Sequence, residues 1–171
     1  MSIGERTADA LFSRRDLIYL FTLQYNRQKE KGGGRDMIST RGRYAIRVMI
    51  DLAEHDTGRY MPLKDVAERQ GISKKYLEII VKDMVAGGLL VGASGKGGGY
   101  KLCRKPEEYP VGEIIELMEG SLATVSCLNA GSEPCPRAEE CRTLPLWAEY
   151  DKLTHDFFYG KTLKDLLRPE K

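Results

Sequence analysis

Residues 63–102 constrain the fold more than any other stretch, because a glycine separates two short helical patterns and a glycine-rich hairpin pattern follows them. Apolar residues recur at helical spacing up to Gly71, which interrupts the pattern. Ser73 then stands where a serine side chain accepts a backbone N–H from the first turn of a helix. The second helix carries an apolar stripe on Leu77, Ile80, Val81 and Met84. The stretch therefore predicts two helices joined by a tight turn, with Ile72 in the corner between them.

A basic, glycine-rich loop at residues 94–99 joins two short strand-like runs, residues 89–93 and 100–103. Glycine suits a hairpin tip because it adopts positive φ and lets the backbone approach another surface closely. A P-loop requires Ser or Thr after its lysine, whereas Gly97 follows Lys96. A dinucleotide fingerprint requires a helix at the glycines, whereas a strand-like run follows here. The loop is therefore predicted to be the tip of a β-hairpin rather than a nucleotide site.

The second helix of this pattern places its charged residues opposite its apolar stripe. Lys74 and Lys75 occupy the first turn, where the helix dipole favours anions and disfavours cations. A solvated charged face is one explanation, and an anionic partner is the other. The basic hairpin favours the partner, because such a hairpin can lie along a nucleic-acid backbone while the helix enters a groove. The predicted fold class is mainly α with a small β-hairpin wing, a winged helix-turn-helix.

The charge distribution supports a division of the chain into a nucleic-acid-binding part and a body. Residues 37–105 carry 13 basic and 7 acidic side chains, whereas residues 106–171 carry 7 basic and 13 acidic ones. Helical patterns at residues 43–53 and 111–118 are expected to pack behind the two central helices. The difference in charge between residues 37–105 and residues 106–171 predicts a phosphate-binding face on the first part and an acidic, partner-facing body on the second.

Several motifs resemble those of one family of bacterial regulators. They are MISTRGRYAIRVMIDLA at residues 37–53, LKDVAERQGISKKYLEIIVKDMVAGGLL at 63–90, GKGGGYKL at 95–102 and PVGEIIELMEG at 110–120. Over residues 37–167 the chain is similar to the family that includes IscR, NsrR and CymR. The resemblance implies a dimeric, sequence-specific transcriptional regulator, a repressor, that binds double-stranded operator DNA.

The same resemblance assigns DNA contacts by position. Lys75 and Glu78 fall where the family faces the major groove, and Ser94 falls where the family often has an arginine in the wing. Lys96 is therefore the expected wing contact. The full predicted DNA-contacting set is Ser73, Lys74, Lys75, Glu78, Ile79, Lys82, Ser94 and Lys96.

Three of the four cysteines lie close together in CLNAGSEPCPRAEEC, residues 127–141. Seven and five residues separate Cys127, Cys135 and Cys141, which is wider than the short spacings of zinc fingers. Prolines on both sides of Cys135 predict a loop that can aim the thiols at one point, and thiolates suit iron–sulfur clusters as well as zinc. Three unrelated free cysteines are the alternative, although a polar segment does not suit core cysteines. The fourth, Cys103, is expected to pack at the end of a strand.

By resemblance, the three clustered cysteines hold a [2Fe-2S] or related cluster that adjusts DNA binding. The chain departs from the family at the fourth ligand. The IscR pattern has a histidine where Leu144 stands, and the NsrR type uses a carboxylate near the position of Arg43. Glu139, Glu140, an acidic residue of a partner subunit and a small thiol are open candidates. A cluster-free regulator controlled by a protein partner or by thiol oxidation is the alternative.

Beyond these cysteines, large apolar residues recur at near-heptad spacing on Leu146, Tyr150, Leu153 and Phe157, with Trp147 beside them. The remaining chain is too short to cover so many large side chains, so a second copy is expected to cover them. A homodimer also suits two recognition helices in successive major grooves. Gly160 is expected to end this helix, and Thr162 to cap a last short helix at residues 163–167.

The chain is expected to divide into an N-terminal extension (1–36), the winged helix-turn-helix (37–120), a cysteine-bearing sensor loop (121–142), and a dimerisation helix followed by a short helix (143–171). Residues 30–34, EKGGG, back-translate into purine-rich codons that resemble a ribosome-binding site, so translation is expected to start at Met37. The alternative is a genuine N-terminal helix followed by a polar linker.

Two classes of protein are not expected from the sequence. It contains no apolar run of about 18 residues, which a membrane span requires, and no cleavable signal pattern, so the protein is predicted to be cytoplasmic. Its two histidines, His55 and His155, belong to no recognisable catalytic motif, so an enzyme is not expected.

Overall fold

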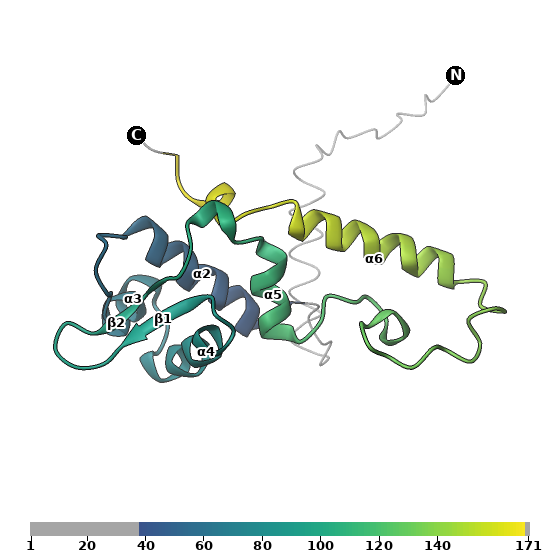
Figure 1. Cartoon of the computed structure of the whole chain (residues 1–171), viewed down its shortest axis with the longest axis horizontal. Helices are drawn as coiled ribbons and strands as arrows, with labels where there is room; N and C mark the ends of the chain where they lie inside the picture. The colour runs from purple at the N-terminus through teal and green to yellow at the C-terminus, as the bar shows by residue number, and fades with distance from the viewer. Residues whose placement is uncertain (1–37, 170–171) are drawn as a thin grey trace, which may run out of the picture. The chain divides into compact units, whose positions relative to one another are not determined.

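The computed structural model of the chain describes residues 38–169, so the predictions for residues 1–36 lie outside the described part. Helices dominate this part, and a two-stranded hairpin accompanies them (Figure 1). The helices are α2 (Thr40–Glu54), α3 (Leu63–Gln70), α4 (Lys74–Ala86), α5 (Val111–Glu119) and α6 (Leu144–Tyr159). The strands are β1 (Leu90–Ala93) and β2 (Gly99–Leu102), and the short 3-10 turns are η1 (Pro106–Glu108), η2 (Ser126–Leu128) and η3 (Lys164–Leu166).

Helix α2 begins three residues earlier than the apolar pattern predicts, because Ser39 caps it. The Ser39 hydroxyl oxygen accepts the N–H groups of Arg41 and Gly42 at 3.1 and 3.3 Å. Ser39 in turn donates its own N–H and hydroxyl to the carboxylate of Glu119, at 3.0 and 2.9 Å. The start of α2 is therefore fixed against the end of α5, the helix with which α2 packs most extensively.

The predicted helix-turn-helix is confirmed. Helix α3 ends at Gly71, whose φ of 62° lies in the left-handed region that glycine adopts without strain. Ser73 caps α4 by accepting the N–H of Tyr76 at 3.3 Å, and Ile72 is buried in the corner between the helices. The apolar stripe of α4 is fully buried, and it consists of Leu77, Ile80, Val81 and Met84.

The hairpin is joined to the body through the start of β2. Its strands are antiparallel, with Leu90 opposite Leu102. Met61, in the loop after α2, exchanges two backbone hydrogen bonds with Tyr100 at 2.9 and 2.8 Å. A Cβ atom at Gly99 would lie 2.1 Å from the carbonyl oxygen of Met61, so only glycine allows this close approach. The hairpin therefore has a fixed position relative to α3 and α4.

A buried acidic residue joins α2 to α3. Asp51 is 1% exposed, and its carboxylate accepts hydrogen bonds from Arg69 at 2.7 and 3.0 Å and from the Gln70 side chain at 2.9 Å. Burial by itself raises the pKa of Asp51, but these hydrogen bonds and the Arg69 charge outweigh burial and lower the pKa below its ordinary value of 3.8. Asp51 is therefore ionised and fully paired at neutral pH.

Two local predictions are wrong. Cys103 is exposed, because it directly follows the last residue of β2 and its side chain lies outside the core. The predicted last short helix is a single 3-10 turn, Lys164–Leu166. Thr162 was expected to cap it by accepting a backbone N–H. Instead, Thr162 donates its own N–H and hydroxyl to the Asp165 carboxylate, at 2.8 and 3.1 Å. Leu163, the residue before this turn, is fully buried, so the end of the chain packs against the core.

Candidate nucleic-acid interface

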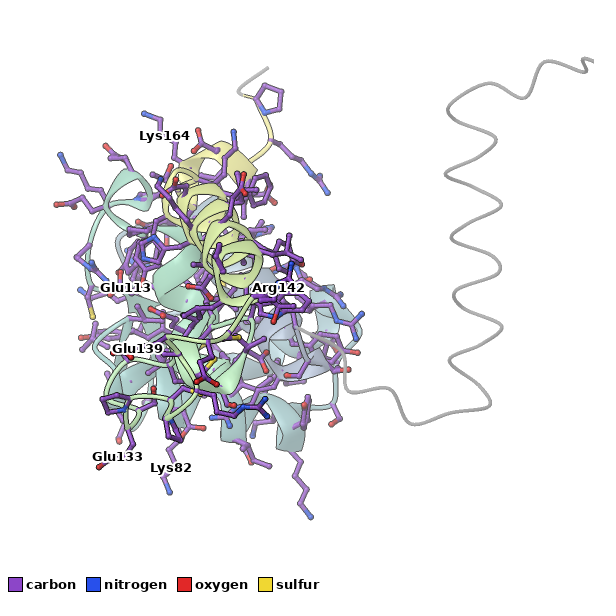
Figure 2. The ribbon with its side chains drawn as sticks, turned by 90° about the vertical axis from the view of Figure 1, so that its right-hand side faces the viewer. Lys82, Glu113, Glu133, Glu139, Arg142 and Lys164 are labelled. Atoms are coloured by element: carbon purple, nitrogen blue, oxygen red, sulfur yellow. The ribbon has the colours of Figure 1, made fainter. Side chains whose placement is uncertain are left out.

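Helix α4 presents one face to solvent, and the predicted DNA contacts lie there or on the hairpin. Because the stripe that includes Leu77 and Ile80 is buried, Lys75, Ile79 and Lys82 lie on the opposite side of the helix. Figure 2 shows the Lys82 side chain directed away from the ribbon. Every residue of the predicted contact set is exposed: Ser73, Lys74, Lys75, Glu78, Ile79, Lys82, Ser94 and Lys96.

An open groove separates α4 from the hairpin. Lys74, Glu78 and Lys82 line it on the α4 side, and Ser94 lines it on the hairpin side. Lys64, near the start of α3, adds a positive charge that the sequence patterns did not single out. Lys74 and Glu78 form an ion pair at 3.5 Å, and both side chains are more than half exposed, so solvent screens the pair. The structure thus brings residues of three elements to one groove.

The hairpin carries its own positive charges. Lys96 is exposed at the tip, where Gly95 and Gly97 both have positive φ. Lys101, on β2, lies 4.8 Å from the ring of Tyr60, a cation–π contact that holds the lysine beside the hairpin base. Nothing in the sequence pattern pointed to Lys101, because the contact joins two segments that are far apart in the chain. The hairpin therefore carries one lysine at its tip and another on β2.

Contacts from α2 hold α4 in place. The guanidinium of Arg41 forms an ion pair with the carboxylate of Asp83, which lies on the side of α4 away from the hairpin groove. The rings of Tyr44 and Tyr76 meet edge to face, with 5.8 Å between their centroids. These contacts fix which face of α4 is turned outward.

The predicted cysteine loop follows α5 and precedes α6. Cys127 is exposed within η2, whereas Cys135 and Cys141 are half-buried. Over residues 38–169, no three histidine, cysteine or acidic side chains are grouped closely enough to hold a metal ion. The structure therefore places the three thiols in one loop without bringing them to one point.

The chemistry of the loop fits a thiolate-bound group. Cys141 lies just before α6, with its sulfur 3.5 Å from the Thr143 hydroxyl. Hydrogen bonds from the Thr143 side chain and backbone, together with the charge of Arg137, lower the pKa of the Cys141 thiol. Leu144, the position of the IscR-type histidine, is the first residue of α6 and has no ligating atom. Soft thiolate donors therefore fit an iron–sulfur cluster, and the fourth ligand is unassigned.

The loop is fastened to α6 near both of its ends. Asp151, two turns into α6, accepts the backbone N–H and the hydroxyl of Thr124 through one carboxylate oxygen, at 2.8 and 3.2 Å. At the other end, Cys141 stands three residues before α6 begins. The Ser121 hydroxyl donates to the Asn129 side-chain oxygen at 2.6 Å and closes the first part of the loop. The cysteine loop is therefore joined to α6 near both of its ends.

Helix α6 leaves its apolar stripe uncovered. Leu153 and Phe157 are each 61% exposed, and Leu146, Trp147 and Tyr150 are exposed with them. Thr154 is the one buried residue of this helix. The far end of α6 docks on α5, where the Tyr159 hydroxyl donates to the Glu116 carboxylate and the Tyr159 ring occupies the space that a Cβ at Gly112 would need. The bond to Glu116 raises the pKa of Tyr159 to about 12.

Comparison with known proteins places this geometry in a family. The profile of the Rrf2 family, described as an iron-dependent transcriptional regulator, matches residues 38–169. The chain belongs to the Rrf2 family. Protein rrf2 of Nitratidesulfovibrio vulgaris is 37% identical over 131 residues, covering 77% of this chain and 87% of that protein. The regulator IscR of Aliivibrio salmonicida is 36% identical over 130 residues, which cover 76% of each chain.

The solved structures of the Rrf2 family agree with this fold. The structure of CymR, the global cysteine regulator of B. subtilis, is similar with a TM-score of 0.61 and 32% identity, covering 75% of this chain and 94% of CymR. The chain is therefore a winged helix-turn-helix transcriptional regulator of the Rrf2 family and not an enzyme. None of the helices within residues 38–169 has the length and apolar character needed to cross a membrane.

Proposed function

We propose that this Rrf2-family regulator acts in the cytoplasm as a dimeric repressor that binds double-stranded operator DNA and senses its signal through the cysteine loop. The observation that carries the DNA-binding part is the continuous exposed surface formed by the outer face of α4 and the groove beside the hairpin. A helix of this kind fits the major groove, while a basic hairpin contacts the flanking backbone.

The residues of this surface divide by chemistry. Lys75, Lys82 and Lys96 present ammonium groups, which attract phosphates without regard to sequence. Glu78 presents carboxylate oxygens, which accept hydrogen bonds from the amino group of cytosine or adenine in the major groove. Ser94 has only a short side chain, so Lys96 is the stronger wing contact. Glu78 therefore serves specificity, and the lysines serve affinity.

The dimer part of the proposal rests on α6. Five large apolar side chains share its exposed stripe, and single monomers seldom expose so many in one patch. A second copy of the same helix, packed antiparallel or crossed, covers both stripes by two-fold symmetry. Dimerisation also sets the distance between the two α4 helices, which must match successive turns of the operator.

The sensing part rests on the donor set. Cys127, Cys135 and Cys141 are the three residues that would hold a [2Fe-2S] cluster, and a fourth ligand comes from outside this triplet. Such a cluster supplies iron that reacts with oxygen or nitric oxide. The chain's own contribution is mechanical, because the Thr124–Asp151 contact and the direct continuation into α6 pass any change in the loop to the dimer helix.

A second candidate is a cluster-free regulator that senses oxidation of a thiol. The lowered pKa of Cys141 favours it, because the thiolate is the form that oxidants attack. CymR, which resembles this chain in structure, is the global cysteine regulator of B. subtilis. Both candidates share the DNA surface and the dimer, and metal analysis separates them.

Selection of bound sequences from random DNA with the full chain tests the shared part. The expected result is one enriched sequence with two-fold symmetry, whose half-sites are about one or two helical turns apart. Enrichment of no sequence, with binding that depends only on salt, would contradict an operator-specific regulator. An enriched site without two-fold symmetry would contradict the dimer.

A further inference from the structure

Ile79 is an apolar residue at the centre of the face that α4 turns outward. Its side chain is 54% exposed, more than that of any other large apolar residue of α4 in the described chain. Lys75 lies one turn before it and Lys82 one turn after it, on the same side of the helix. Both lysines are exposed. An apolar side chain is thus held between two cations on the surface that meets DNA.

The base edges of the major groove offer few apolar groups. Guanine and adenine present polar atoms at N7, O6 and N6, and cytosine presents its amino group. Burying any of these against an aliphatic side chain removes a water without replacing its hydrogen bond. Thymine differs, because its C5-methyl group projects into the groove and gains from apolar contact. The flanking lysines can reach phosphates on either side of such a base.

We propose that Ile79 is a specificity-determining residue that reads the C5-methyl group of a thymine in each half-site of the operator. This inference rests on the proposed DNA-binding function and adds the chemical group that one residue recognises. Glu78, the neighbouring residue, faces the hairpin groove, so the two side chains meet different base pairs. The operator half-site should therefore contain a thymine at one position that no hydrogen-bonding residue of α4 reads.

Replacement of single thymines by deoxyuridine tests this directly, because it removes the methyl group and leaves base pairing intact. The probe is the operator selected with the full chain, with each thymine replaced in turn. One position per half-site should weaken binding about threefold to fivefold, as expected for one buried methyl group. Replacement in both half-sites should weaken binding about tenfold or more. A protein that binds all deoxyuridine operators as tightly as the thymine operator would overturn the inference.

The variant Ile79→Ala assigns the effect to this residue. Because the side chain is exposed, the variant should fold with an unchanged melting temperature, and it should bind the thymine and deoxyuridine operators equally. Leu166→Ala removes another exposed aliphatic side chain, on η3 and away from α4, and should keep the full discrimination. An Ile79→Ala protein that still prefers thymine would refute the assignment to Ile79.

The experiment also separates this inference from the function on which it rests. If selection enriches no operator, the DNA-binding proposal fails and the thymine contact fails with it. If a specific operator is bound but no thymine methyl group contributes, DNA binding stands and the role of Ile79 is refuted.

Discussion

The winged helix-turn-helix and the segment that follows it differ in how they are stabilised. Residues 38–120 contain nearly all of the core, including fully buried side chains from α2, α4 and α5. Among the described residues, none between 121 and 153 is buried. The first region therefore has its own apolar core, whereas the second exposes apolar side chains and thiols. This contrast matches the proposed division between a DNA-binding region and a region that controls it.

The two regions are nevertheless joined at defined points. Tyr159 docks the end of α6 on α5 through Glu116, and Asp151 ties the start of the cysteine loop to the middle of α6. Helix α6 is thus the shared element of both regions. In the proposed dimer, a change in the loop should therefore shift α6 against its copy and alter the spacing of the two DNA-binding surfaces.

The largest expected effect comes from placing a charge in the exposed stripe of α6. Leu153→Asp should dissociate the dimer, because an unpaired buried carboxylate in the interface costs several kcal/mol. Sedimentation equilibrium should show monomers with unchanged helical content by circular dichroism. Lys152→Asp, the adjacent residue on another side of α6, should remain dimeric. A dimeric Leu153→Asp protein would place the interface elsewhere.

The next largest expected effect is a loss of folding stability in the variant Asp51→Asn. The variant leaves Arg69 without its buried carboxylate and should lower the free energy of unfolding by about 3 kcal/mol. The same change at the exposed Asp156 should cost under about 0.5 kcal/mol. Urea denaturation at neutral pH measures both, and equal effects would contradict the burial of Asp51.

The pH dependence of this stabilisation follows from the lowered pKa of Asp51. The folded pKa lies below the ordinary value of 3.8, so the contribution is fully present above pH 3.8 and is lost as the pH falls through the folded pKa. Denaturation between neutral pH and acid should therefore show a steeper loss for the natural protein than for Asp51→Asn.

The local pattern of the sequence was sufficient for the helix-turn-helix and the wing. Gly71, Ser73 and the apolar stripe of α4 lie within a few residues of one another, so the turn and the helix that follows it can be predicted from local sequence alone. The start of α2 was missed because its cap depends partly on Glu119, which is distant in sequence. The Asp51–Arg69 pair is another distant contact, although an aspartate on the apolar side of a helical pattern is a recognisable sign of a buried partner.

The second region was predictable only in part. The near-heptad stripe of α6 and the three cysteines stand out in the sequence, and the structure exposes both. The Thr124–Asp151 contact was not predicted, because a single hydrogen-bonded carboxylate leaves no periodic pattern. Cys103 was predicted to pack and is exposed, since the strand ends one residue before it.

A smaller effect, on DNA binding alone, is expected from the outer face of α4. Lys75→Ala should weaken binding to all sequences and reduce the salt dependence by about one unit per subunit. Glu78→Ala should instead change which operators are bound, and Lys164→Ala, on η3, should change neither. Fluorescence anisotropy at several salt concentrations measures these effects. If both α4 variants keep the natural affinity and preference, α4 is not the recognition helix.

The smallest expected effect concerns the contact between the loop and α6. Asp151→Ala removes both hydrogen bonds from Thr124, and the Thr124 amide should exchange its hydrogen about fivefold faster, corresponding to about 1 kcal/mol. Asp156→Ala, five residues further along α6, is the matched control and should leave this exchange unchanged. Equal exchange in the Asp151 variant and the natural protein would show that the loop is held by other contacts.

Anaerobic purification followed by an absorption spectrum with iron and sulfide analysis tests most directly whether the cysteine loop holds an iron–sulfur cluster. The natural protein should be coloured and contain iron and sulfide, whereas Cys135→Ala should be colourless and altered in operator affinity. A colourless natural protein that holds stoichiometric zinc would contradict the iron–sulfur proposal. So would a Cys135→Ala protein that keeps its iron and its regulation.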